Sequence, residues 1–205
     1  MQALLQPLSK LGEYEEIKNR IEKNRGILQL AGCIDSQKAH VIYGLGQEKK
    51  NRLVIAENEL KAKELYEDLK FYYPDVFYYP ARDLIFFEAD IHGNLLTKQR
   101  MQVIAALLEK KSVTVVTSIS GCMDYLLPIS VLKKHVLHFK NDSVLDTEAL
   151  KKDLINMGFE YNAQAETPGQ FAMRGGIVDI FLSTEENPVR IEMWGDEIDS
   201  IRSFD

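Results

Sequence analysis

The sequence predicts a mixed α/β chain of two domains, and three observations lead to that prediction. Short apolar runs alternate with helical patterns over residues 1–129, which is typical of a parallel sheet covered by helices. Residues 171–205 instead hold consecutive runs of branched and aromatic residues, which predict an antiparallel meander. The two parts also differ in net charge, since residues 1–129 hold equal numbers of acidic and basic residues and residues 130–205 hold the whole net charge of -6. We expect a three-layer α/β domain over 1–129 and a small α+β domain over 130–205.

Composition fits an ordinary soluble protein. The 205 residues are 45% hydrophobic and 27% charged, which excludes a disordered chain. Cys33 and Cys122 lie far apart without a C-x-x-C pattern, so neither a disulfide framework nor a zinc ribbon is indicated. No stretch has the pattern of a signal peptide or the length of a membrane span. We expect a cytoplasmic protein, and the small number of strands in the first domain indicates a piece of something longer.

In the first domain, strands and helices are distinguished by their apolar patterns. Continuous apolar runs are typical of strands buried in a parallel sheet, and apolar residues at helical spacing predict amphipathic helices. Asparagine is a favoured N-cap residue, which predicts helix starts at Asn58 and Asn94. The expected helices cover residues 2–10, 13–24, 59–69 and 94–110, and the expected strands cover residues 39–45, 52–57, 76–80 and 113–118.

The second domain is expected to contain a strand, a helix and then the meander. Asp146 is a favoured N-cap residue, and Gly158 follows the last apolar position of the helix. The Gly195-Asp196 pair suits a two-residue hairpin, and Gly175-Gly176 predicts a bulge or a close backbone approach. The expected strands cover residues 135–140, 177–181 and 189–193, with a further strand beginning at Ile198.

One segment is similar to a phosphate-binding loop. The P-loop pattern is G-x-x-x-x-G-K-[ST], in which glycines let the backbone amides surround phosphates. Gly44 and Lys50 match this pattern, but Lys49 replaces the second glycine and Asn51 replaces the residue whose hydroxyl holds Mg²⁺. We interpret the segment, which should follow a strand, as a degenerate and inactive nucleotide loop.

Other chemistry is weakly indicated. The four histidines lack metal-binding spacing, and the aromatic residues between Phe71 and Tyr79 have only Lys70 and Arg82 nearby to hold a nucleic-acid strand. We therefore expect these aromatic residues in the core. The acidic second domain is a poor match for a phosphate backbone, since lysine and arginine supply most non-specific affinity for nucleic acids. A protein partner is expected there.

The motifs of the chain resemble those of a known family. The segments VIYGLG, RLVIAEN, FYYPARD, VTVVTS, GQFAMRGGIVDIF and VRIEMWGDEIDSIRSFD resemble the amino-terminal region of the bacterial transcription-repair coupling factors, the Mfd family. The resemblance covers nearly the whole chain, and its last two segments are also similar to the excinuclease protein UvrB. The degenerate phosphate loop and the short connection from Tyr79 to Asn94 favour the Mfd family.

The resemblance implies a UvrB-like module in two parts. Residues 1–129 would form an incomplete RecA-like subdomain with a degenerate P-loop, and residues 130–205 would form a small domain of the type that binds UvrA. The family implies a larger parent that hydrolyses ATP to move on double-stranded DNA and removes stalled RNA polymerase. It implies that ATP and Mg²⁺ bind elsewhere in the parent, and that the small domain contacts downstream domains of the same chain in an inhibited state.

The resemblance also implies residues for the UvrA-binding surface. The family motif carries over onto Arg174 and Phe181, and arginine and phenylalanine are both favoured at interfaces. Phe181 has an alternative role in the core. Because Glu160 stands where some relatives have a basic residue, Arg190 or Arg202 is an alternative contact.

Three hypotheses follow for the function of the chain. The first is a non-catalytic adaptor that binds a repair protein. The second is an ATP-dependent nucleic-acid enzyme module of UvrB type, which requires nucleotide binding at Lys50. The third is a structural domain without a partner site, in which Arg174 matters only for stability.

Overall fold

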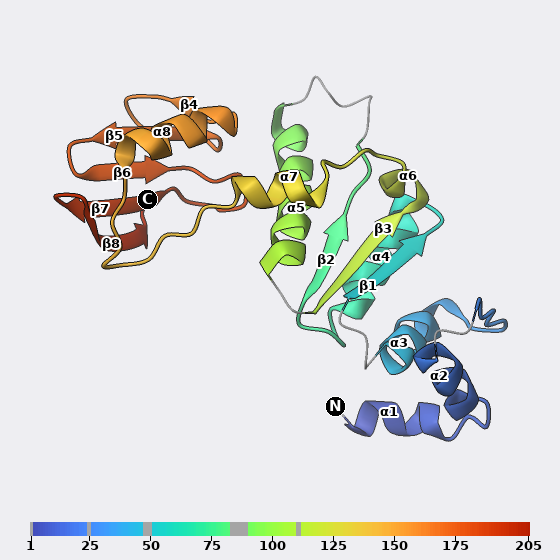
Figure 1. Ribbon diagram of the computed structural model, residues 1–205. Coiled ribbons are helices and arrows are strands. Elements are labelled where there is room, and N and C mark those ends of the chain that lie inside the picture. The colour runs from blue at the N-terminus through green and yellow to red at the C-terminus, as the bar shows by residue number, and fades with distance from the viewer. Residues whose placement is uncertain (1, 24–25, 47–50, 83–89, 110–111) are drawn as a thin grey trace. The chain divides into compact units, whose positions relative to one another are not determined.

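The computed structural model describes residues 2–23, 26–46, 51–82, 90–109 and 112–205. The chain divides into two compact units, and each is described by itself below (Figure 1). The first unit combines Met1–Glu88 with Gln102–Asp124, and the second combines Ala89–Met101 with Tyr125–Asp205. Within the described ranges, no helix is long and apolar enough to cross a membrane.

A three-stranded parallel sheet forms the centre of the first unit. Its order is β1 (Asn51–Ala56), β3 (Val113–Ser118), β2 (Val76–Tyr79). The run VTVVTS is buried at every position because β3 is the central strand, which confirms its prediction as a buried strand. β1 lies at the edge and leaves Leu53 63% exposed. The expectation of a buried strand is wrong there, because its residues alternate between exposed and partly buried positions.

Two helices pack on opposite faces of this sheet. α4 (Glu59–Leu69) contributes Ala62 and Leu69 to one apolar cluster, and the side chain of Asn58 caps it as predicted. α5 (Asp90–Glu109) packs Val103 and Ala106 against β3 on the other side. The predicted N-cap at Asn94 is wrong, because the helix begins at Asp90 and Asn94 lies inside it. Lys110, the predicted end, lies outside the described residues.

The first unit begins with three helices, α1 (Gln2–Ser9), α2 (Tyr14–Glu22) and α3 (Asp35–Leu45). The first two confirm the helices predicted there. The strand predicted over residues 39–45 is wrong, because these residues are the last two turns of α3. A short apolar run does not distinguish a strand from a buried helix, and here Ala39 and Tyr43 are buried at helical spacing.

Three short helices follow β3, namely α6 (Ile119–Cys122), α7 (Ile129–Leu132) and the 3-10 helix η1 (Lys133–His135). The strand predicted over residues 135–140 is wrong, because residues 136–140 pair with no strand in the described part of the chain. Leu137 and Phe139 nevertheless pack against the core of the second unit. Alternating apolar residues can thus be satisfied by packing on a core without entering the sheet.

The second unit contains a five-stranded sheet of order β4-β5-β6-β7-β8. β4 is parallel to β5, and the other neighbours are antiparallel, which confirms the predicted meander and adds two strands before it. The strands are β4 (Glu160–Tyr161), β5 (Gln170–Arg174), β6 (Ile177–Ile180), β7 (Val189–Trp194) and β8 (Glu197–Ser203).

Glycines fix both tight turns of this meander. Gly195, at φ 65°, opens the predicted hairpin between β7 and β8. Gly175-Gly176 forms the turn between β5 and β6, and not a bulge. The alternative of a close backbone approach is confirmed, because a Cβ at Gly176 would lie 2.7 Å from the carbonyl oxygen of Met193.

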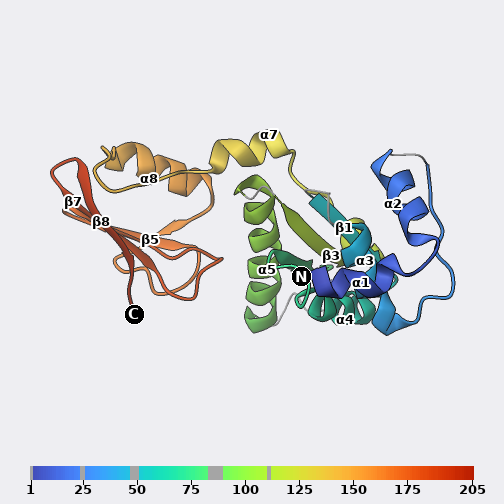
Figure 2. The same cartoon turned by 90° about the horizontal axis from the view of Figure 1, so that it is seen from below.

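One face of the five-stranded sheet carries the core of the second unit. α8 (Thr147–Asn156) lies along this face (Figure 2), and the side chain of Asp146 caps it as predicted. Leu150 and Leu154 of the helix are buried against inward side chains of the strands, among them Phe171 and Ile191. The alternation along each strand sends the remaining side chains to the opposite face.

Candidate partner-binding site on the second sheet

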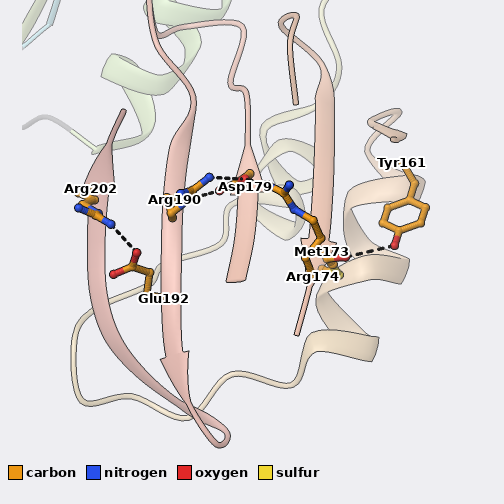
Figure 3. Close-up of polar contacts among 7 residues, drawn as sticks. All are labelled: Tyr161, Met173, Arg174, Asp179, Arg190, Glu192 and Arg202. Atoms are coloured by element: carbon orange, nitrogen blue, oxygen red, sulfur yellow. Dashed lines mark hydrogen bonds and ion pairs between the residues drawn. The ribbon is translucent and has the colours of Figure 1, made fainter. Parts of the chain in front are cut away.

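Two rows of side chains occupy the sheet face that points away from α8. Directly paired residues share a face, so the strand register defines both rows. One row is Ala172, Asp179, Arg190 and Arg202, and the other is Arg174, Ile177, Glu192 and Ser200. All three arginines of residues 130–205 therefore lie on one face (Figure 3).

Asp179 lies at the centre of this face and is only 2% exposed. Arg190 donates to it through two nitrogens, from Nε to Oδ1 at 2.7 Å and from Nη2 to Oδ2 at 2.9 Å. Arg174 donates from Nη2 to Oδ2 at 2.9 Å. Burial alone would raise the pKa of Asp179, but the hydrogen bonds from Arg190 and Arg174 outweigh burial and hold the pKa below its ordinary value. Asp179 is therefore a carboxylate at neutral pH.

The two arginines that hold Asp179 differ in exposure. The side chain of Arg190 is 23% exposed, and its guanidinium lies 4.2 Å from the centre of the Phe204 ring. The side chain of Arg174 is 50% exposed and reaches Asp179 through Nη2. A guanidinium carries five N–H donors. Arg174 thus keeps donors that a partner molecule can reach.

A second ion pair lies beside the first. Arg202 donates from Nη2 to Oε1 of Glu192, and the Ser200 hydroxyl donates to Oε2 at 2.8 Å. The hydrogen bond from Ser200, followed by that from Arg202, lowers the pKa of Glu192. Arg190 and Arg202 are directly opposite in the sheet, where like charges repel each other. Asp179 and Glu192 offset this repulsion because each pairs with one of the two.

The structure brings together some of the predicted partner residues and leaves others apart. Arg174, Arg190 and Arg202 share one face, as described above. Phe181 is half-buried and follows the end of β6. Its backbone N–H donates to the carbonyl of Gln170, so Phe181 lies at the open end of the β5–β6 hairpin, opposite the turn at residues 175–176. Glu160 is exposed on β4, the edge strand.

Asp179 is not among the site residues predicted from the sequence. The available signal was an acidic residue inside the apolar run IVDI, where an unpaired charge would be costly. Its partners become visible only when the register places Arg190 opposite it.

The predicted nucleotide loop does not have the context that a P-loop requires. Gly44 is buried in the last turn of α3, so the chain runs from helix to β1 and not from strand to helix. A Cβ at Gly44 would collide with Cδ1 of Leu8, and Tyr14 donates its hydroxyl to the Gly44 carbonyl at 2.9 Å. This glycine allows α3 to pack closely against α1 and α2. Lys50 lies outside the described residues.

A second polar cluster, which was also not predicted from the sequence, lies at the carboxyl ends of the parallel strands. Glu59 accepts hydrogen bonds from the hydroxyls of Tyr78 and Ser118, and another from the backbone of Ala81 at 3.3 Å. Burial, followed by the hydrogen bond to Glu59, raises the pKa of Tyr78. Ligands of open α/β sheets bind at this edge. Here Glu59 uses both carboxylate oxygens within the protein itself.

A cavity of about 570 Å³ in the first unit is lined by parts of α3, β1 and α4. Some of its charged groups pair with one another, since Lys61 contacts Asp35 at 3.2 Å and Glu64 at 2.9 Å. Among the residues that the structure describes, no group of three or more His, Cys, Asp or Glu could hold a metal ion. Both cysteines of the chain are free.

The sheet face that carries these residues lies in the carboxyl-terminal part of the chain, and this part matches a known family of protein domains. Residues 137–205 match the family model described as the UvrB interaction domain.

Similarity to complete proteins extends over more of the chain. This chain is 31% identical, over 94% of its own length, to the transcription-repair-coupling factor of Bacillus subtilis strain 168. It is 30% identical, over 78% of its length, to the factors of Staphylococcus haemolyticus strain JCSC1435 and Staphylococcus aureus strain USA300. The aligned region spans 17% of the first relative and 14% of the other two. The predicted resemblance to a UvrB-like module of the transcription-repair-coupling factors is confirmed.

Proposed function

We propose that this chain is a non-catalytic adaptor module that recruits UvrA to a transcription-repair-coupling factor. The observation that carries the proposal is Arg174, half-exposed on the open sheet face inside the segment that matches the UvrB interaction domain. Phe181 is a second contact candidate from the family motif. Its half-buried position beyond β6 makes its expected contribution smaller than that of Arg174.

The chemistry of the face supports a protein partner with acidic groups. The face presents three arginines and two carboxylates, although the domain as a whole is acidic. Arginine is enriched at interfaces, and its planar donors match a carboxylate with two parallel hydrogen bonds. A negatively charged polymer such as DNA would meet repulsion from the rest of the domain.

The role of the parent protein belongs to the same proposal. The family resemblance implies that the parent is an ATP-dependent translocase on double-stranded DNA that removes stalled RNA polymerase, with ATP and Mg²⁺ bound in other domains. This module would then connect the parent to excision repair in the cytoplasm. Contact between the module and downstream domains of the parent would limit access to the arginine face until the motor engages.

The alternative function, an ATP-dependent module of UvrB type, has less support. A working phosphate loop needs a strand before it and a helix after it, whereas Gly44 lies in the last turn of a helix that precedes a strand. Titration with ATP tests the alternative directly. Saturable binding that disappears in Lys50→Ala would favour the UvrB-type module over the adaptor.

Calorimetric titration of the chain with UvrA tests the adaptor function. We expect saturable binding that weakens at least about tenfold, or about 1.4 kcal/mol, in Arg174→Ala. Arg20→Ala is the matched control, because Arg20 is an exposed arginine on α2 in the other unit, and its loss should leave the affinity unchanged. No binding at about 50 μM, which corresponds to about -6 kcal/mol, would contradict the proposal.

A further inference from the structure

We propose that Asp179 is a positioning residue for partner binding, which holds the Arg174 guanidinium in the orientation that a carboxylate of the partner requires. The inference rests on the proposed function, since it concerns the same surface. Arg174 makes the contact with the partner, and Asp179, which the partner cannot reach, sets the orientation of Arg174.

The geometry shows a chain of contacts that ends at the solvent. Phe204 lies against the Arg190 guanidinium, Arg190 holds both oxygens of Asp179, and Oδ2 of Asp179 also accepts from Arg174 (Figure 3). Two hydrogen bonds from Arg190 fix the plane of the Asp179 carboxylate. Because the carboxylate is 2% exposed, the partner is not expected to contact it.

This arrangement has a physical consequence for binding. A half-exposed arginine samples many rotamers, and ordering it in a complex opposes association. The hydrogen bond to Asp179 restricts Arg174 before the partner arrives, and it uses one nitrogen while the other donors remain accessible. A guanidinium only donates hydrogen bonds, so the partner group that fits these donors is an acceptor, and a carboxylate gives the strongest such pair.

A double-mutant cycle with UvrA as the probe tests the inference. The variants are Asp179→Asn, Arg174→Ala and the combination, each titrated with UvrA alongside the wild-type chain. If Asp179 acts through Arg174, Asp179→Asn weakens binding about fivefold to tenfold in the wild-type chain and less than about twofold when Arg174 is already alanine. An Asp179→Asn effect of equal size in both backgrounds would overturn the positioning role.

Glu192→Gln is the matched control. It also converts a carboxylate to an amide on the same face, but its partners are Ser200 and Arg202 and not Arg174. If the net charge of the face set the affinity, Asp179→Asn and Glu192→Gln would change it alike. We expect the effect of Glu192→Gln, whatever its size, to be the same with and without Arg174. A dependence on Arg174 as strong as that of Asp179→Asn would also overturn the inference.

Stability is controlled separately. All titrations are made below the unfolding transition of every variant, as measured by circular dichroism. If Asp179→Asn does not fold, Arg190→Lys replaces it, because lysine keeps a positive charge near Asp179 but cannot form the two-nitrogen contact. It should weaken UvrA binding in the wild-type background and have little effect with Arg174→Ala. An equal effect in both backgrounds would overturn the positioning role.

Failure of this inference is distinguishable from failure of the proposed function. If the wild-type chain does not bind UvrA, the proposed function and this inference both fail. If the wild-type chain binds and Arg174→Ala weakens binding, but the effects of Asp179→Asn and Arg174→Ala multiply, only the positioning role is overturned.

Discussion

Each unit of the chain has a carboxylate at the centre of a polar cluster, and the two clusters differ in what surrounds the carboxylate. In the first unit, Glu59 accepts from two hydroxyls and a backbone amide of the same unit. In the second unit, Asp179 accepts from two arginines, one of which is half-exposed. The first cluster holds strand ends together, whereas the second also presents donors to the solvent. A carboxylate can therefore bond entirely within the fold or hold a side chain that stays exposed, depending on its partners.

The sheet types account for where the two carboxylates lie. The parallel sheet has α4 on one face and α5 on the other, so polar side chains gather beyond the carboxyl ends of its strands. In the meander, α8 and the apolar core occupy one face, and the opposite face carries the ion pairs. The second arrangement leaves a polar sheet face with a half-exposed arginine, whereas in the first the polar groups bond to one another at the strand ends.

The largest expected effect comes from breaking the cluster of the second unit. Asp179→Ala should lower the free energy of unfolding by about 3 kcal/mol, because it leaves Arg190 without the acceptor for its two hydrogen bonds. Urea unfolding followed by circular dichroism measures the loss. Hydrogen exchange should show that the amides of β5, β6 and β7 lose protection in this variant. A loss below about 1 kcal/mol would mean that Arg190 finds other acceptors at little cost.

A smaller effect is expected from protonating the same carboxylate. The folded-state pKa of Asp179 lies below the ordinary value of 3.8, so its contribution to stability is complete above that value. The contribution is lost as pH falls through the lowered pKa. The stability difference between the wild-type chain and Asp179→Asn should therefore narrow below about pH 4. Urea unfolding at a series of pH values measures it, and a constant difference down to about pH 2 would contradict the assignment.

The closed cluster of the first unit should give a still smaller effect, on stability alone. Tyr78→Phe removes one of the hydroxyls that donate to Glu59 and should lower the free energy of unfolding by about 1 kcal/mol. Glu59 keeps the donors Ser118 and Ala81, which limits the loss. UvrA affinity should not change, and an altered affinity would show that the first unit takes part in binding. Calorimetry and urea unfolding of the same preparation check both points.

The two units also differ in how far the sequence predicts them. The meander is predictable because period-two alternation and glycine turns specify antiparallel strands locally, as at Val189–Trp194 and Gly195. The run Ala39–Leu45 has the apolar pattern of a strand but is helical. The segment Asp35–Leu45 shows no clear helical periodicity in its sequence, and the helical spacing of Ala39 and Tyr43 is visible only in which side chains the fold buries. Residues 136–140 alternate and yet do not pair, since nothing local shows which strands are neighbours.

The candidate site is predictable in part for the same reason. Arg174 follows from the family motif, and Arg190 and Arg202 from their positions near it. Asp179 does not, because its importance depends on strand register, which places Arg190 opposite it and Arg174 within reach. The cluster at Glu59 depends on three segments of the first unit and is equally hidden in the sequence.

The smallest expected effect comes from the exposed ion pair on the same sheet face. The side chain of Arg202 is 60% exposed, and its pair with Glu192 is solvated, as is common for surface ion pairs of little net stability. Arg202→Ala should leave the urea midpoint unchanged within error, although the guanidinium resembles that of Arg190. Its loss also removes the like charge opposite Arg190, which further reduces any cost. A midpoint shift as large as that of Asp179→Ala would show that the face behaves as one network, and the distinction between buried and exposed carboxylates on it would not hold.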